Sequence, residues 1–222
     1  PAGVEAVPSD VVVIVDILRF TTAVDAAVSR GAVVFPCRWK DASARRYAEQ
    51  VRAVLAAAGD APGSSLSPVS LLALASGDRV VLPSPNGSTC AALAASRGAT
   101  VVAGCLRNAT AVGTWLQPRA RTVTVIACGE RWPDGTLRPS LEDYLGAGAV
   151  LATLPGSRSP EAEAVADAWH TASTRAADVV ASSVSGRELL ARGWERDLEF
   201  AVDVDASQCV PVLREGFVDA AQ

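Results

Sequence analysis

The hydrophobic pattern begins with an unbroken β-branched run, VVVIV, at residues 11–15, and Asp16 follows it directly. A run without alternation leaves no face for water, and such strands belong mostly to parallel sheets that are covered by helices. Residues 11–15 therefore predict a strand buried on both faces. Apolar runs beginning near residues 79, 100 and 121 predict further strands.

The next segment, residues 21–32, changes to an alanine-rich pattern that predicts a helix. Thr21 or Thr22 is expected to cap its first turn, and Gly31 is expected to end it in a left-handed conformation. Residues 32–37, AVVFPC, then predict a second strand.

The same pattern returns later in the chain. TTAVDAAVSRGAVVFPC resembles STCAALAASRGATVVAGC at a constant offset: Ser88 follows Thr21 by 67 positions (88 − 21), and Ser96 follows Ser29 by the same number (96 − 29). A shared bias toward alanine and glycine would explain part of the match. We interpret it as an internal duplication of a strand-loop-helix-strand unit.

The C-terminal half contains two further predicted helices. Residues 140–154 form one, with Ser140 and Asp143 spaced as a capping box. A second helix is expected from Ser185 to near Gly193, followed by an extended segment.

Alternating strands and helices predict an α/β fold of three layers, α/β/α. At 222 residues the chain is long enough for a substantial core. We expect a single domain over residues 1–222, with two fused lobes of about 10–70 and 78–222 as the alternative reading.

Composition excludes several classes of function. The net charge of −4 has no basic cluster, so neither nucleic acid nor a membrane surface is an expected partner. No apolar run approaches the ~18 residues of a membrane span, and we expect a cytoplasmic protein, with a homodimer left open. The five cysteines include no CxxC pair, which argues against disulfides and structural zinc.

Polar residues gather just after the predicted strands, where ligands bind in open α/β sheets. Each has a plain structural reading as a cap, a turn residue or a solvated charge. Together they supply hydrogen-bond donors for a phosphate group and the carboxylates that Mg²⁺ prefers. This combination indicates phosphoryl chemistry. The single histidine, His170, lacks a partner acid for a catalytic triad. The strand-end residues are Asp16, Arg19, Ser84, Asn86, Gly87, Cys105, Arg107, Asn108 and Glu130.

Six ordered segments, VDILRFTTAV, PSPNGSTCAAL, AGCLRNATAV, ACGE, LEDYLGAGAVL and the tail from SGRELL to QCVP, resemble the 2-phosphosulfolactate phosphatase family. The resemblance implies a magnesium-dependent phosphatase that converts 2-phosphosulfolactate to 3-sulfolactate, a step toward coenzyme M in methanogens. Phe20 departs from the small residue that is common in this family. Its bulk is expected to reshape the substrate end of the pocket.

The predicted site follows from the residues and this resemblance together. Asp16 is expected to bind Mg²⁺ or to attack phosphorus, and the sequence does not decide between these roles. The alternatives are a phosphatase for another small phosphorylated acid and a non-catalytic anion-binding module. We assign Asp16, Arg19 and Glu130 to catalysis, Asp16, Glu130, Glu142 and Asp143 to the metal, and Thr21, Thr22, Ser84, Asn86, Gly87, Ser88, Arg107 and Asn108 to substrate.

The duplication adds a geometric expectation. If the two copies face one cleft, the helix N-termini near Thr21 and Ser88 should point at a shared ligand. Arg19 would lie on one side of that ligand, and Arg107 with Asn108 on another.

Overall fold

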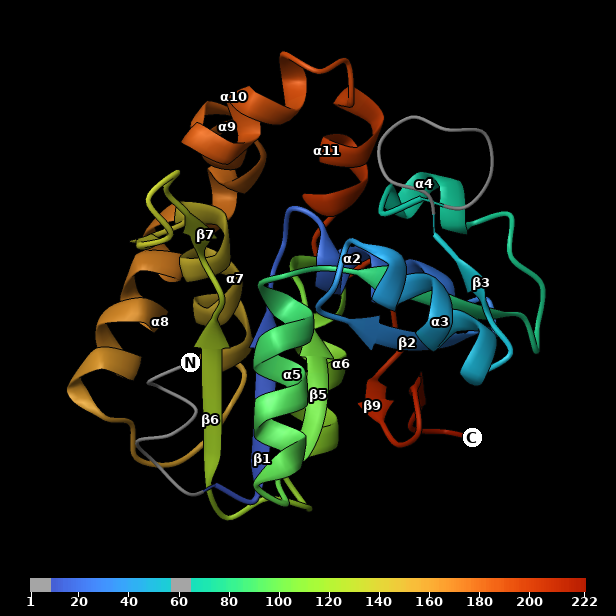
Figure 1. The fold of residues 1–222 in the computed structure, drawn as a ribbon. Helices are drawn as coiled ribbons and strands as arrows, with labels where there is room; N and C mark the ends of the chain where they lie inside the picture. The colour runs from blue at the N-terminus through green and yellow to red at the C-terminus, as the bar shows by residue number, and fades with distance from the viewer. Residues whose placement is uncertain (1–8, 57–64) are drawn as a thin grey trace.

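A computed structural model describes residues 9–56 and 65–222, and one mixed sheet of eight strands forms its frame (Figure 1). The order across the sheet is β3-β4-β2-β10-β9-β5-β1-β6. The strands are β1 (Val11–Val15), β2 (Val33–Cys37), β3 (Val54–Leu55), β4 (Arg79–Pro83), β5 (Thr100–Gly104), β6 (Val123–Ala127), β9 (Pro211–Leu213) and β10 (Phe217–Asp219).

This order has an internal symmetry. Two parallel three-stranded halves, β6-β1-β5 and β3-β4-β2, flank a central antiparallel hairpin of β9 and β10. Along the chain the elements run β1-α2-β2-α3-β3 and then β4-α5-β5-α6-β6, with a short α4 between the two series. The helices are α2 (Phe20–Val28), α3 (Ala42–Gln50), α4 (Pro68–Leu71), α5 (Gly87–Ser96) and α6 (Ala109–Leu116).

Strand register confirms the predicted duplication. Val11 of β1 pairs with Thr100 of β5, and Arg79 of β4 pairs with Val33 of β2. Thr100 follows Val33 by 67 positions (100 − 33), whereas Arg79 follows Val11 by 68 (79 − 11). The extra position arises because the loop after β4 is one residue shorter than the loop after β1. By the strand offset, Ser84 therefore occupies the place of Asp16.

The two repeats exchange strands. Each repeat leaves its first strand in one half of the sheet and places its other two in the opposite half. A boundary near residues 70–78 thus separates the repeats along the chain but does not separate the halves of the sheet. Residues 57–64 of the predicted first lobe lie outside the described residues.

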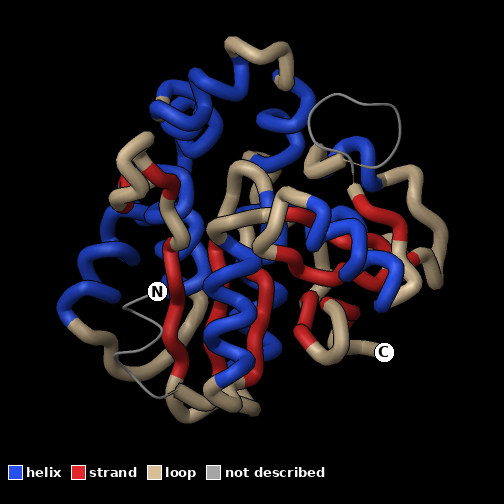
Figure 2. Tube along the Cα trace, viewed as in Figure 1, coloured by secondary structure: helices blue, strands red, loops and turns tan. Residues whose placement is uncertain are grey.

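Helices cover both faces of the sheet, as Figure 2 shows (helices blue, strands red). Val12 and Ile14 of β1 face a core that contains α2 and α5. Val11, Val13 and Val15 face a second core that contains α6 and α7 (Leu141–Ala152). Every residue of β1 is buried, because each face of the strand meets a helix layer. The three-layer α/β/α prediction is confirmed.

The C-terminal helices lie beside and beyond the half of the sheet that contains β6. α8 (Pro160–Ala172) packs on α7, and Figure 1 shows α9 (Ala176–Ser182), α10 (Val184–Leu190) and α11 (Glu195–Ala201) beyond the carboxyl end of β6. None of the helices in the described ranges is long and apolar enough to cross a membrane.

The predicted extended segment after Gly193 is wrong, because α11 forms there. Leu198 and Ala201 are buried while Glu195 and Glu199 stay exposed. That spacing of three between buried positions is helical, although LEFAVDVD alternates in sequence like a strand.

Candidate active site

The carboxylate of Asp16 lies where the two repeats meet. Its Oδ1 accepts a hydrogen bond from the backbone N–H of Phe20 at 3.2 Å, the first residue of α2. Its Oδ2 accepts one from the N–H of Gly87 at 3.0 Å, the first residue of α5, and another from the Ser84 hydroxyl at 3.4 Å. Both helix N-termini, which carry positive partial charge, thus converge on one carboxylate.

Gly87 makes this close approach feasible. A Cβ atom at position 87 would lie 2.8 Å from Oδ2 of Asp16 and 2.3 Å from Cδ1 of Phe20. Phe20 itself is fully buried and packs edge-to-face on Phe217, with ring centroids 6.3 Å apart. The expectation that Phe20 reshapes the substrate pocket is therefore wrong, because its ring fills the core.

Thr21 and Thr22 stabilise the loop after β1. Both are fully buried inside α2, and their hydroxyls donate to the carbonyl oxygens of Asp16 at 2.9 Å and of Ile17 at 2.8 Å. Neither caps the helix as predicted, since Asp16 bonds the N–H of Phe20 instead. Their assignment to substrate binding stays a prediction.

Asp143 joins two strand-end loops. Its Oδ1 accepts from the N–H of Ile17 at 2.7 Å, after β1, and its Oδ2 from the N–H of Gly129 at 2.9 Å, after β6. The predicted capping box is wrong, because Ser140 makes no side-chain cap bond and Asp143 reaches across to the neighbouring loops. Asp143 thereby fixes the position of the segment that begins with Asp16.

Four carboxylates share this end of the sheet. Burial, together with the charge of Glu130, raises the pKa of Asp16 to about 6. Burial, together with the charges of Asp16 and Glu142, raises the pKa of Asp143 well above its usual range. Glu142 is only 2 % exposed, and its Oε2 has no hydrogen-bond partner among the described residues. The site therefore concentrates negative charge that the chain does not fully neutralise.

The short hairpin of β7 (Glu130–Arg131) and β8 (Leu137–Arg138) supplies a cation that the sequence analysis missed. Glu130 pairs with Arg138 across this hairpin, and Arg138 is buried. Its guanidinium binds both carboxylate oxygens of Glu188, at 2.8 Å and 3.0 Å. The Pro-Asp-Gly turn between these strands was the available signal.

The predicted metal ligands are near one another without forming a coordination site. Over residues 9–56 and 65–222, no three acidic, histidine or cysteine side chains are placed to hold a metal ion. The pKa shifts show that Asp16 interacts with Glu130 and that Asp143 interacts with Asp16 and Glu142. Their assignment to Mg²⁺ stays a prediction.

Arg19 lies at the far end of the loop that Asp16 begins. Its guanidinium forms an ion pair with Asp197 of α11 and stacks on the Trp194 ring, 3.8 Å from the ring centroid. The Ser67 hydroxyl, which precedes α4, donates to the same Asp197 carboxylate. The structure thus directs Arg19 toward α11.

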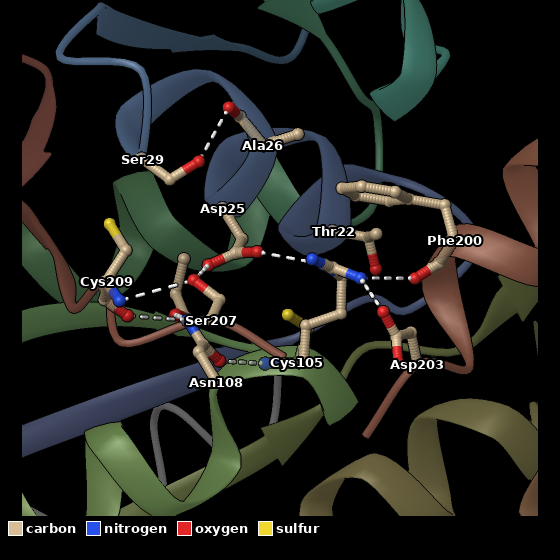
Figure 3. A network of polar contacts seen from close by, with 12 residues as sticks. Thr22, Asp25, Ala26, Ser29, Cys105, Asn108, Phe200, Asp203, Ser207 and Cys209 are labelled. Atoms are coloured by element: carbon tan, nitrogen blue, oxygen red, sulfur yellow. Dashed lines mark hydrogen bonds and ion pairs between the residues drawn. The ribbon is translucent and has the colours of Figure 1, made fainter. Parts of the chain in front are cut away.

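Arg107 belongs to a separate polar network, and Figure 3 labels its partners Asp25, Phe200 and Asp203. Its Nε lies 3.3 Å from Asp25 Oδ2, and its Nη1 lies 3.0 Å from the carbonyl oxygen of Phe200 and 3.2 Å from Asp203 Oδ2. The Ser207 hydroxyl donates to the other oxygen of Asp25 at 2.6 Å. This network joins α2 to the segment that leads into the central hairpin.

Asn108 forms hydrogen bonds beside this network, to residues near the end of β5 and to the segment that precedes β9. Its Oδ1 accepts from the N–H of Cys105 at 2.8 Å, and its Nδ2 donates to the carbonyl oxygens of Ala103 and Cys209. In the described part of the chain, the hydrogen bonds of Arg107 and Asn108 go to this network and not to Asp16. The structure therefore does not bring the two expected sides of the cleft together.

The remaining predicted residues flank α5. Ser84 contacts Asp16, as described, whereas the Ser88 hydroxyl donates to the carbonyl oxygen of Leu82 at 3.4 Å. The carbonyl oxygen of Asn86 accepts the N–H of Cys90 at 3.1 Å. Only Ser84 and Gly87 of this segment therefore reach the carboxylate.

Comparison with known proteins gives this arrangement a family. A family model described as 2-phosphosulpholactate phosphatase matches residues 3–216. The chain belongs to the 2-phosphosulfolactate phosphatase family. The resemblance carried by the six sequence segments is thereby confirmed.

Three relatives of this chain have names that come from this family. The chain is 28% identical to the 2-phosphosulfolactate phosphatase of Methanothermobacter thermautotrophicus, over 95% of this chain and 90% of that protein. It is 29% identical to a probable 2-phosphosulfolactate phosphatase of Deinococcus radiodurans, over 93% and 89% of the two chains. A probable member from Carboxydothermus hydrogenoformans is 28% identical, over 92% and 87%.

We expect Gly87→Ala to reduce both stability and turnover. Alanine normally favours a helix over glycine by about 1 kcal/mol, yet its Cβ would collide here with Asp16 and Phe20. Relief of that overlap should cost about 1–3 kcal/mol and displace the carboxylate. Chemical denaturation and steady-state kinetics would measure the two effects.

Ala92→Gly is the matched control, because Ala92 is exposed on the same helix. It should lose about 1 kcal/mol of stability and keep its turnover. A Gly87→Ala variant as stable and active as the unsubstituted protein would contradict the described packing.

Proposed function

We propose that this chain is a phosphatase that hydrolyses 2-phosphosulfolactate, or a closely similar small phosphorylated acid, to 3-sulfolactate and phosphate with Mg²⁺ as cofactor. The observation that carries the proposal is the convergence of the α2 and α5 N-termini on Asp16. These N–H groups hold the carboxylate at the edge of the sheet where ligands bind in open α/β folds, and the family match supports this substrate.

Asp16 is the residue proposed to react. With a pKa of about 6, it is mostly ionised at neutral pH, and the N–H groups of Phe20 and Gly87 fix its orientation. A carboxylate held in this way is suited to attack phosphorus in line with the leaving oxygen. Asp143 supports it indirectly, by holding the backbone on either side of the site.

The donor chemistry of the site fits Mg²⁺, which prefers carboxylate oxygens. The unpartnered Oε2 of Glu142 and the mutual repulsion of the acids are what a cation would relieve. Asp16, Glu130, Glu142 and Asp143 would hold the ion. Asp16 and Asp143 each use both oxygens on backbone N–H groups, so Glu142 is the first candidate. Bound there, Mg²⁺ would supply charge neutralisation for the phosphoryl oxygens.

Asp16→Asn tests the central residue. The amide neither attacks phosphorus nor coordinates Mg²⁺ as a carboxylate does, so turnover of 2-phosphosulfolactate should fall by about three orders of magnitude or more. Circular dichroism should show a folded variant. Rapid quench with ³²P-labelled substrate should trap a phosphoenzyme on Asp16 if the carboxylate is the nucleophile.

The control is Asp134→Asn, which changes an exposed carboxylate in the β7–β8 turn and should leave the rate unaltered. Activity of Asp16→Asn within about tenfold of the unsubstituted enzyme would remove Asp16 from the mechanism. A panel of small phosphorylated acids separates the alternatives. Better turnover of another acid would identify that substrate, and sulfolactate binding without any turnover would indicate a binding module.

Metal binding has a readout that is independent of activity. MgCl₂ should raise the melting temperature above its value in EDTA, because the cation offsets repulsion among the buried acids. Glu142→Gln should lose most of this rise, while Glu49→Gln, at an exposed position of α3, should keep it. An unchanged rise in Glu142→Gln would show that Glu142 does not bind the ion.

A further inference from the structure

Residues 194–203, which include α11, contact both Arg19 and Arg107, the two arginines of the predicted site. The Cζ atom of Arg19 lies 3.8 Å from the ring centroid of Trp194, and that of Arg107 lies 3.7 Å from the ring centroid of Phe200. One carboxylate of the segment pairs with each arginine, Asp197 with Arg19 and Asp203 with Arg107. The two arrangements look alike, but their surroundings differ.

The charge of Arg107 is fully balanced by the chain. Asp25, Asp203 and the carbonyl oxygen of Phe200 all contact its guanidinium. The Asp203 side chain is 64% exposed, so solvent weakens its contribution. Removal of Asp203 alone would leave Arg107 with a buried carboxylate partner.

Arg19 has a different balance. Within the described ranges, its ion pair is with Asp197 alone, through Nη1. The Asp197 side chain is 5% exposed and that of Arg19 is 11% exposed, so water screens this pair little. The other oxygen of Asp197 accepts the Ser67 hydroxyl. One buried carboxylate therefore sets how much positive charge Arg19 presents.

The position of Arg19 relates this pair to the site. Arg19 follows Asp16 by three residues in the loop that Asp143 holds through the N–H of Ile17. The stack on Trp194 fixes the plane of a guanidinium whose remaining N–H groups have the fork geometry that matches a planar or tetrahedral oxyanion.

We propose that Arg19 on the face of Trp194 forms an oxyanion subsite for the acid group that the substrate retains after dephosphorylation, and that Asp197 is its resident counter-ion. This rests on the proposed function, in which the substrate carries a sulfonate and a carboxylate besides phosphate. Asp197 lowers the affinity of the subsite by neutralising Arg19, and an incoming oxyanion competes with Asp197 for the guanidinium. Asp197 is thus a specificity-determining residue that limits retention of the acidic product.

Asp197→Asn is the decisive variant, with Asp203→Asn as matched control, since each removes one carboxylate from the same segment. Without its counter-ion Arg19 is buried and uncompensated, so Asp197→Asn should melt at a lower temperature than the unsubstituted protein. Its dissociation constant for 3-sulfolactate, measured by calorimetry, should fall about tenfold. KM should fall while kcat stays within about threefold. Asp203→Asn should bind 3-sulfolactate like the unsubstituted protein.

Lactate distinguishes the acid groups, because it lacks the sulfonate. A gain in Asp197→Asn for 3-sulfolactate alone assigns the subsite to the sulfonate, and an equal gain for lactate assigns it to the carboxylate. Unchanged or weaker 3-sulfolactate binding in Asp197→Asn overturns the proposal. If that variant does not fold, Ser67→Ala loosens the same carboxylate, and binding no tighter than that of the unsubstituted protein overturns the proposal in its place.

Failure of the proposed function and failure of the role of Asp197 give different results. An unsubstituted protein that neither turns over 2-phosphosulfolactate nor binds 3-sulfolactate contradicts the proposed function. Normal turnover with equal 3-sulfolactate affinity in the unsubstituted protein and Asp197→Asn contradicts only the role of Asp197.

Discussion

The whole arrangement depends on one carboxylate shared by two helix N-termini. Asp16 accepts the first backbone N–H of α2 and of α5, and these helices belong to different repeats that exchange strands across the sheet. The equivalent position in the second repeat is Ser84, which donates to the same carboxylate. A second acid there would face Asp16 at short range and repel it. The duplicated framework therefore places a single carboxylate between the two helix N-termini.

Much of this framework could be predicted from sequence. The unbroken run at residues 11–15 predicted a strand buried on both faces, and the repeated helix pattern predicted the duplication that the strand register confirms. Placement of Asp16, Ser84 and Gly87 after strands predicted that they would meet at one sheet edge, because the carboxyl ends of parallel strands lie together. These predictions depend on local periodicity and on strand order.

What the sequence could not provide was the direction of long side chains. Arg19 and Arg107 follow strands, as residues that bind a phosphate group would. Both nevertheless pair with carboxylates from residues 194–203, a segment that was expected to be extended. Asp143 has the spacing of a capping residue but bonds two loops that are distant in sequence. Such contacts depend on tertiary packing, which outweighs local preference.

Titration of Asp16 tests the central claim most directly. Burial raises the pKa of Asp16 to about 6 in the folded protein, against 3.8 for an ordinary aspartate. Between these values the folded state holds more protons than the unfolded state, so ionisation of Asp16 destabilises the fold as pH rises. Denaturant unfolding in EDTA, from about pH 4 to about pH 7, should show Asp16→Asn gaining stability relative to the unsubstituted protein. A pH-independent difference, or one that favours the unsubstituted protein as pH rises, would contradict the account.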